Sequence, residues 1–93
     1  MAYAPPHVRH IAEKASILLK KHGVKRGVYT EDLAVFYVFD DEGEVKDITD
    51  ISVLDSKDIV VCGLIEGRVR CSVLKNGERV EEAEIHEDSL TFR

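Results

Sequence analysis

The spacing of apolar residues changes once along this chain, and that change limits what the chain can fold into. In the first segment, apolar residues recur at steps of three and four, which places them on one stripe of a helix. They are Val8, Ile11, Ala12, Ala15, Leu18 and Leu19. After residue 32 the apolar residues instead form short runs bounded by Gly, Asp and Asn, a pattern typical of strands. The chain therefore predicts one N-terminal helix followed by a sheet.

The helix is predicted over residues 6–22. Pro6 suits the first helical turn, where its missing N–H leaves no hydrogen bond unmade. Gly23 is a natural left-handed cap, and the cationic residues 20–22 oppose the helix dipole in the last turn. Ile17 falls on the polar side of this helix. We therefore expect Ile17 to be exposed.

Residues 23–32 are predicted to be a connector. The continuous apolar run 33–39 favours a strand buried on both faces. Further strands are expected near 44–49 and at about 58–65, 68–75, 78–86 and 89–93. Glu66-Gly67 and Asn76-Gly77 predict tight hairpin turns, because Asn-Gly meets the positive φ angles of a type I′ turn. The apolar parity changes within 78–86, which predicts a bulge near Glu81-Glu82.

These elements together predict an α+β fold, with one N-terminal amphipathic helix packed on a meandering antiparallel sheet of five or six strands. Ninety-three residues form one domain with a modest core. We expect residues 1–93 to be that domain. A basic helix and connector occupy residues 1–32, and an acidic antiparallel β body occupies residues 33–93.

The two cysteines are predicted to face each other across a hairpin. If Glu66-Gly67 is a two-residue loop, Cys62 lies opposite Cys71 in a pair without hydrogen bonds. Such pairs have Cα atoms about 4.5 Å apart, which is within disulfide range. A three-residue loop would separate the sulfur atoms. Whether the pair is oxidised, or consists of two reduced core residues, stays open at this point.

The charges are sorted along the chain. Residues 1–30 hold six Lys or Arg and a single acid, whereas residues 31–93 hold seven basic and seventeen acidic residues. Two interpretations are open. The acidic body can neutralise the basic segment through ion pairs, or the basic segment can face an acidic partner. The chain has one Asn and no Gln, and few amides among many charged residues are typical of proteins adapted to heat, including archaeal ones.

Motifs that carry chemistry are missing from the sequence. The acidic turn around Asp40–Glu44 lacks the ligand spacing of a calcium loop, and His7 with His10 supplies too few ligands for zinc. The serines stand in no nucleophile motif, and no phosphate-binding glycine loop is present. We therefore expect no catalytic residues, no metal and no cofactor.

The sequence favours a small non-catalytic protein-binding module. It would be an accessory or regulatory subunit of a larger intracellular assembly, such as a filament or another multiprotein complex, and would self-associate as a homodimer in the simplest case. The alternative is a nucleic-acid-binding protein that uses the basic helix, which the acidic body opposes. No apolar run is long enough to cross a membrane, and we expect a cytoplasmic location. The candidate partner-binding residues are Arg9, His10, Lys14, Ile17, Lys21, Lys25, Arg26, Leu90 and Phe92.

Overall fold

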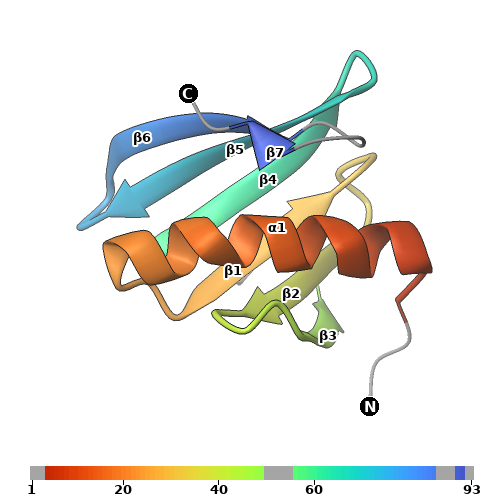
Figure 1. The fold of residues 1–93 in the computed structure, drawn as a ribbon, viewed down its shortest axis with the longest axis horizontal. Coiled ribbons are helices and arrows are strands. Elements are labelled where there is room, and N and C mark those ends of the chain that lie inside the picture. The colour runs from red at the N-terminus through yellow and green to blue at the C-terminus, as the bar shows by residue number, and fades with distance from the viewer. Residues whose placement is uncertain (1–3, 50–55, 86–89, 92–93) are drawn as a thin grey trace.

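One helix packs across one face of a single mixed sheet (Figure 1). The computed structural model describes residues 4–49, 56–85 and 90–91. Its strands lie in the order β3-β2-β1-β4-β5-β6-β7. The elements are α1 (Pro6–His22), β1 (Arg26–Thr30), β2 (Phe36–Asp40), β3 (Val45–Thr49), β4 (Ile59–Ile65), β5 (Arg68–Lys75), β6 (Glu78–Ile85) and β7 (Leu90–Thr91). The α+β prediction, with one N-terminal helix on a mostly antiparallel sheet, is confirmed.

The bounds of α1 are those that its sequence predicts. Gly23 adopts φ 68°, and the N–H of Val24 donates to the carbonyl of Leu19 at 2.9 Å, which closes the helix with a left-handed cap. The Lys75 ammonium also donates to the His22 carbonyl at 3.0 Å. The predicted apolar stripe of α1 is buried, and Ile17 on the opposite side is 46% exposed, as expected.

The prediction that residues 23–32 form a connector is wrong, because Arg26–Thr30 is strand β1 in the middle of the sheet. β1 pairs antiparallel with β2 and parallel with β4, so the sheet is not a pure antiparallel meander. β1 is short and begins with Arg26-Gly27, which gives little strand signal. Gly27 is needed here because the Phe39 ring packs so closely that a Cβ atom would lie 2.5 Å from it.

The predicted strand over 33–39 begins three residues later than expected. Phe36–Asp40 forms β2, whose residues are buried on both faces of the sheet, as predicted for this run. Leu33 and Val35, however, are exposed. The first residues of this apolar run therefore form a loop and not a strand, and the loop exposes Leu33 to solvent.

The hairpin registers agree with their turn residues. Cys62 pairs with Cys71, Leu64 with Val69 and Ile65 with Arg68, which is the register of a two-residue loop. The Cys62 and Cys71 sulfur atoms are at disulfide distance, 2.16 Å. The bulge expected at Glu81-Glu82 falls one residue earlier. Val73 pairs with Glu81 and Leu74 with Arg79, so Val80 has no partner on β5.

The sheet has two apolar faces. Residues on one face, including Tyr29, Phe39, Cys62 and Cys71, pack with the stripe of α1 in the main core. Alternation along the strands sends their neighbours to the opposite face, where a second cluster forms on β1, β2 and β4. Its members are Val28, Phe36, Val38 and Ile59, with Val61 and Leu74 packed against them.

Candidate functional site

A groove of about 540 Å³ lies where the carboxyl ends of the parallel strands β1 and β4 meet. The backbone that leaves β1 leads to β2 on one side of the pair, and the backbone that leaves β4 leads to β5 on the opposite side. The two connections therefore diverge at this point. In open sheets, such a point leaves a crevice that often binds ligands. The groove is lined by Thr30, Glu31, Leu33, Phe36, Val61, Cys62, Gly63, Leu64, Ile65, Arg70, Ser72 and Glu82.

Leu33 forms one wall of the groove and is 77% exposed. Its φ angle of 66° lies in the left-handed region, which a bulky apolar residue rarely adopts. Two hydrogen bonds hold the loop: the Leu33 N–H donates to Thr30 Oγ1 and the Ala34 N–H donates to Asp32 Oδ1, both at 2.9 Å. A strained and exposed apolar side chain is stable only when its surroundings impose it, and it suggests a function.

Gly63 leaves the floor of the groove without a side chain. In the register of the sheet, Gly63 lies between Thr30 on β1 and Arg70 on β5. A Cβ atom added at Gly63 would have the Thr30 carbonyl oxygen, at 3.9 Å, as its nearest neighbour. The hollow is therefore an open space on the sheet, not a position crowded by neighbouring atoms. The 53% exposed Ile65 lies farther along the same strand and adds apolar surface to the lining.

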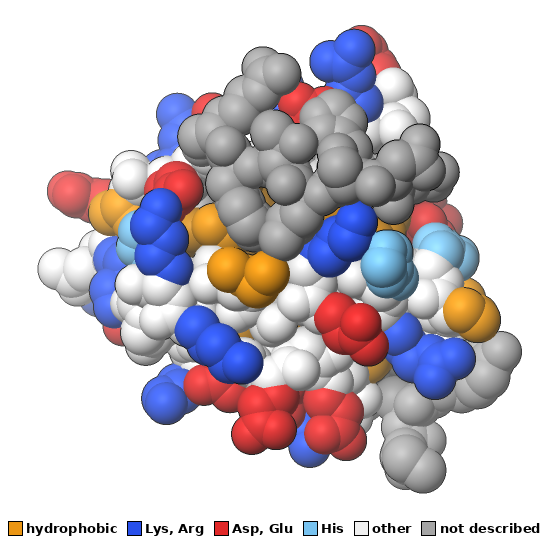
Figure 2. Space-filling view, in the orientation of Figure 1, with side chains coloured by type: hydrophobic (Ala, Val, Ile, Leu, Met, Phe, Trp, Pro, Cys, Tyr) orange, Lys and Arg blue, Asp and Glu red, His pale blue; other side chains and the backbone are white. Residues whose placement is uncertain are grey.

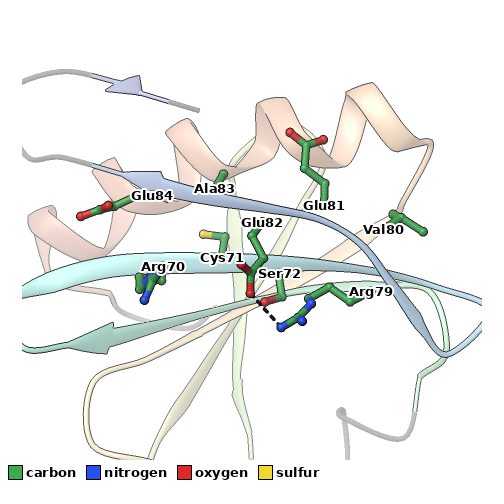
Figure 3. Close-up of a pocket in the computed structure, with 9 residues that line it drawn as sticks. All are labelled: Arg70, Cys71, Ser72, Arg79, Val80, Glu81, Glu82, Ala83 and Glu84. Carbon is green, nitrogen blue, oxygen red and sulfur yellow. Dashed lines mark hydrogen bonds and ion pairs between the residues drawn. The ribbon is translucent and has the colours of Figure 1, made fainter. Parts of the chain in front are cut away.

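The opposite wall is polar and continues across β5 and β6. Arg70, Ser72 and Glu82 line both the groove and an adjoining hollow of about 460 Å³. Figure 3 shows these three residues together with Arg79 on the side of the strands turned away from α1, whereas Glu81 points toward the helix. Arg79 donates to Glu82 Oε1 at 2.8 Å. Arg70 has no ion pair with another residue of the described ranges, so its charge remains available on this wall.

A smaller pocket of about 390 Å³ lies on the other side of Glu31, between the first turns of α1 and the sheet. Here Glu31 Oε2 accepts hydrogen bonds from the Tyr29 hydroxyl and from His7 Nε2, each at 3.0 Å. These bonds attach the start of the Glu31–Val35 loop to the helix and to β1. His10 lines this pocket, so one of the candidate residues lies next to the groove, although not in it.

At two candidate positions, the basic segment forms ion pairs with acidic residues of the β body. Lys21 lies 3.1 Å from Glu81 on β6, and Lys25 lies 3.7 Å from Asp41 after β2. Figure 2, viewed from the helix side, shows basic and acidic side chains interspersed on this surface. Both pairs support the interpretation in which the acidic body neutralises the basic segment.

The other candidate residues lie outside the described lining of the groove. Arg9 and Ile17 are exposed on α1, Lys14 is half-buried on the same helix, and Arg26 is exposed at the start of β1. Leu90 belongs to β7, whereas Phe92 lies outside the described residues. The described lining of the groove therefore includes none of the nine candidates, and the sequence pattern did not point to the groove. The available signal was Thr30 and Asp32 just before Leu33, because Asp side chains, and Thr side chains more weakly, favour turns.

Two carboxylates of the described residues have lowered pKa values. The pKa of Glu81 is lowered mainly by the hydrogen bond from His22 Nε2 at 2.5 Å and then by the bond from Lys21 at 3.2 Å. For Asp40, burial alone would raise the pKa, but the N–H groups of Glu44 and Glu42 and the charge of Lys46 lower it overall. Both carboxylates act in the fold and lie outside the groove.

The described lining of the groove combines apolar and polar side chains. It offers exposed aliphatic side chains, a hollow and one available cation. Within the described ranges, no group of three or more His, Cys, Asp or Glu could hold a metal ion. Among the residues described, no helix has the length and apolar character needed to cross a lipid bilayer. No family model, curated protein or solved structure matches the chain.

Proposed function

We propose that this chain is a small non-catalytic protein-binding module, an accessory or regulatory subunit that docks through the groove at the carboxyl ends of β1 and β4. The observation that carries the proposal is the juxtaposition of an exposed Leu33, held at φ 66°, with the open floor at Gly63. Clustered exposed apolar side chains rimmed by polar residues are typical of protein interaction sites.

The groove also defines the chemistry of its partner. An aliphatic side chain of the partner would fill the hollow over Gly63, against Leu33 on one side. Arg70, one position across the sheet from Gly63, would receive an acidic group. The Glu31 bonds to His7 and Tyr29 keep the Leu33 loop in place before binding, which lowers the entropy lost when the partner docks. The partner is therefore a protein surface that presents an aliphatic residue beside an acid.

Nucleic acid is the less favoured partner. Lys21 and Lys25 are paired with acids, and the net charge of the chain is −5. A polyanion would have to displace those ion pairs and approach an acidic body. Among the described residues that line the groove, Arg70 is the one cation, and it lies beside Glu31 and Glu82.

The test is a comparative pull-down. The tagged chain is expressed in its native cell, and the proteins that it captures are identified by mass spectrometry. We expect a protein that is retained by the wild type and by Ile17→Ala but lost by both Leu33→Gly and Gly63→Val. Leu33→Gly removes the exposed side chain at a φ angle that suits glycine, and Gly63→Val fills the hollow. Partners that are retained equally by all four proteins would overturn the proposal that this groove is the docking site.

A further inference from the structure

The groove carries both a projection and a hollow on one surface. Leu33 projects from the loop after β1, and Gly63 leaves the neighbouring position on β4 empty. A surface that contains a projection beside its own matching hollow is complementary to itself under a two-fold rotation. Such an arrangement gives a closed, isologous contact, the commonest form of self-association in soluble proteins.

Opposite charges adjoin the projection and the hollow: Asp32, which is next to Leu33 in the loop although outside the groove lining, and Arg70, which lines the groove. Asp32 directly precedes Leu33, is exposed, and uses only Oδ1 in the hydrogen bond to the Ala34 N–H. Arg70 on β5 pairs with Gly63 on β4 in the register of the sheet, and it has no ion pair with another described residue. A contact that placed Leu33 of one copy over Gly63 of another would bring these two opposite charges toward each other, because Asp32 adjoins Leu33 and Arg70 pairs with Gly63 in the sheet. The proposed partner presents an aliphatic residue beside an acid, and this chain itself has that pair in Leu33 and Asp32.

We infer that the first occupant of the groove is a second copy of this chain, in a two-fold dimer. Leu33 of each copy fills the Gly63 hollow of the other, and Asp32 of each copy pairs with Arg70 of the other. The inference rests on the proposed docking function of the groove and names its partner. A dimer contact of this kind buries the Leu33 side chain, whose exposure on the single chain is otherwise unfavourable.

Sedimentation velocity and light scattering from about 5 to 500 µM protein test the inference, because self-association depends on concentration. The wild type should form a dimer over this range. Leu33→Gly and Gly63→Val should each weaken the dimer about tenfold or more, while Ile17→Ala leaves it unchanged. Melting curves check that each variant folds. We expect both to fold, because Gly63 has open space for the added side chain and the φ angle of Leu33 suits glycine.

A charge exchange tests the predicted pairing itself. Asp32→Arg and Arg70→Asp should each weaken the dimer about tenfold, and the double variant should restore it to within about threefold of the wild type. Failure of the double variant to restore the dimer overturns the pairing. A wild type that is monomeric throughout overturns the inference of a second copy. If the pull-down still separates the groove variants from Ile17→Ala, the docking function then stands with a different protein as occupant.

Discussion

Cys62 and Cys71 lie directly opposite each other on β4 and β5, with their Cα atoms 4.0 Å apart. The pair joins the strand that borders β1 to the strand that bears Arg70, so it fixes the two sides of the groove floor. Cross-links of residues so close in sequence restrict the unfolded chain only modestly.

We therefore expect a small effect of reduction on stability. With nine residues of sequence separation, breaking the bond should lower the free energy of unfolding by at most ~2.5 kcal/mol. Urea unfolding with and without a reductant measures the change, and a Cys62→Ala/Cys71→Ala variant is the control that the reductant should not affect. Intact mass after alkylation shows whether the purified protein contains the bond, and two alkylated thiols without prior reduction would contradict it.

The two sides of α1 should respond oppositely to truncation. Leu18 is buried in the main core, so Leu18→Ala should lower the free energy of unfolding by roughly 2–4 kcal/mol through loss of contacts and a residual cavity. Ile17→Ala, one residue away and exposed, should change it by less than about 0.5 kcal/mol. Chemical denaturation of both variants makes the comparison. A large loss for Ile17→Ala would mean that its side chain is covered in the protein as it exists in solution.

Gly27 and Gly63 occupy neighbouring central strands and should differ in their tolerance of a methyl group. Gly27→Ala places Cβ 2.5 Å from the Phe39 ring, which must shift, so we expect a loss of about 1–3 kcal/mol. Gly63→Ala meets no atom closer than 3.9 Å and should leave stability unchanged or raise it by about 0.5–1 kcal/mol. Thermal melts of the two variants provide the measurement. Equal effects would show that the hollow at Gly63 is not open.

Stability should depend on Glu81 in a defined range of pH. Because hydrogen bonds from His22 and Lys21 lower the pKa of Glu81 in the folded protein below its ordinary value of 4.5, these interactions stabilise the fold above that pH. This contribution is lost as the pH falls through the lowered folded value. Glu81→Gln should therefore be less stable than the wild type at pH 7, by on the order of 1 kcal/mol, and the difference should disappear in acid.

The control for Glu81 is Glu78→Gln, an exposed position on the same strand. It should not reproduce the pH-dependent difference. Unfolding free energies measured from about pH 2 to 8 make the comparison over the range in which a carboxylate loses its charge. A Glu81→Gln difference that persisted unchanged at the acid end would exclude the ion pairs as its cause.

Nucleic-acid affinity should be negligible even at low salt. Fluorescence anisotropy with labelled single- and double-stranded DNA and RNA at about 50 and 200 mM salt covers the range in which phosphate contacts are salt-sensitive. Sub-micromolar binding at the higher salt would contradict this expectation if it were abolished by changing the basic candidates to Ser. Those positions are Arg9, Lys14, Lys21, Lys25 and Arg26.

The features that the sequence determined are those encoded by residues near one another in the chain. The bounds of α1 follow from its apolar spacing with Pro6 and Gly23, and the Cys62–Cys71 pairing follows from the turn at Glu66-Gly67. In each case, a few adjacent residues restrict the backbone to one geometry. The helix end, or the residue that pairs across the hairpin, then follows from the local sequence. Even the bulge in β6 was located within one residue, from the change in apolar parity alone.

Only the tertiary structure decided which distant segments meet. The five residues of β1 carry little sign of its central place in the sheet. That place depends on its parallel pairing with β4, where Val28 packs with Ile59 on one face and Tyr29 with Cys62 on the other. The groove likewise depends on the parallel pairing that brings Thr30 beside Gly63, 33 positions later. Such pairings are selected by the summed burial of two faces of a sheet, and this energy is gained only when segments far apart in the sequence come together.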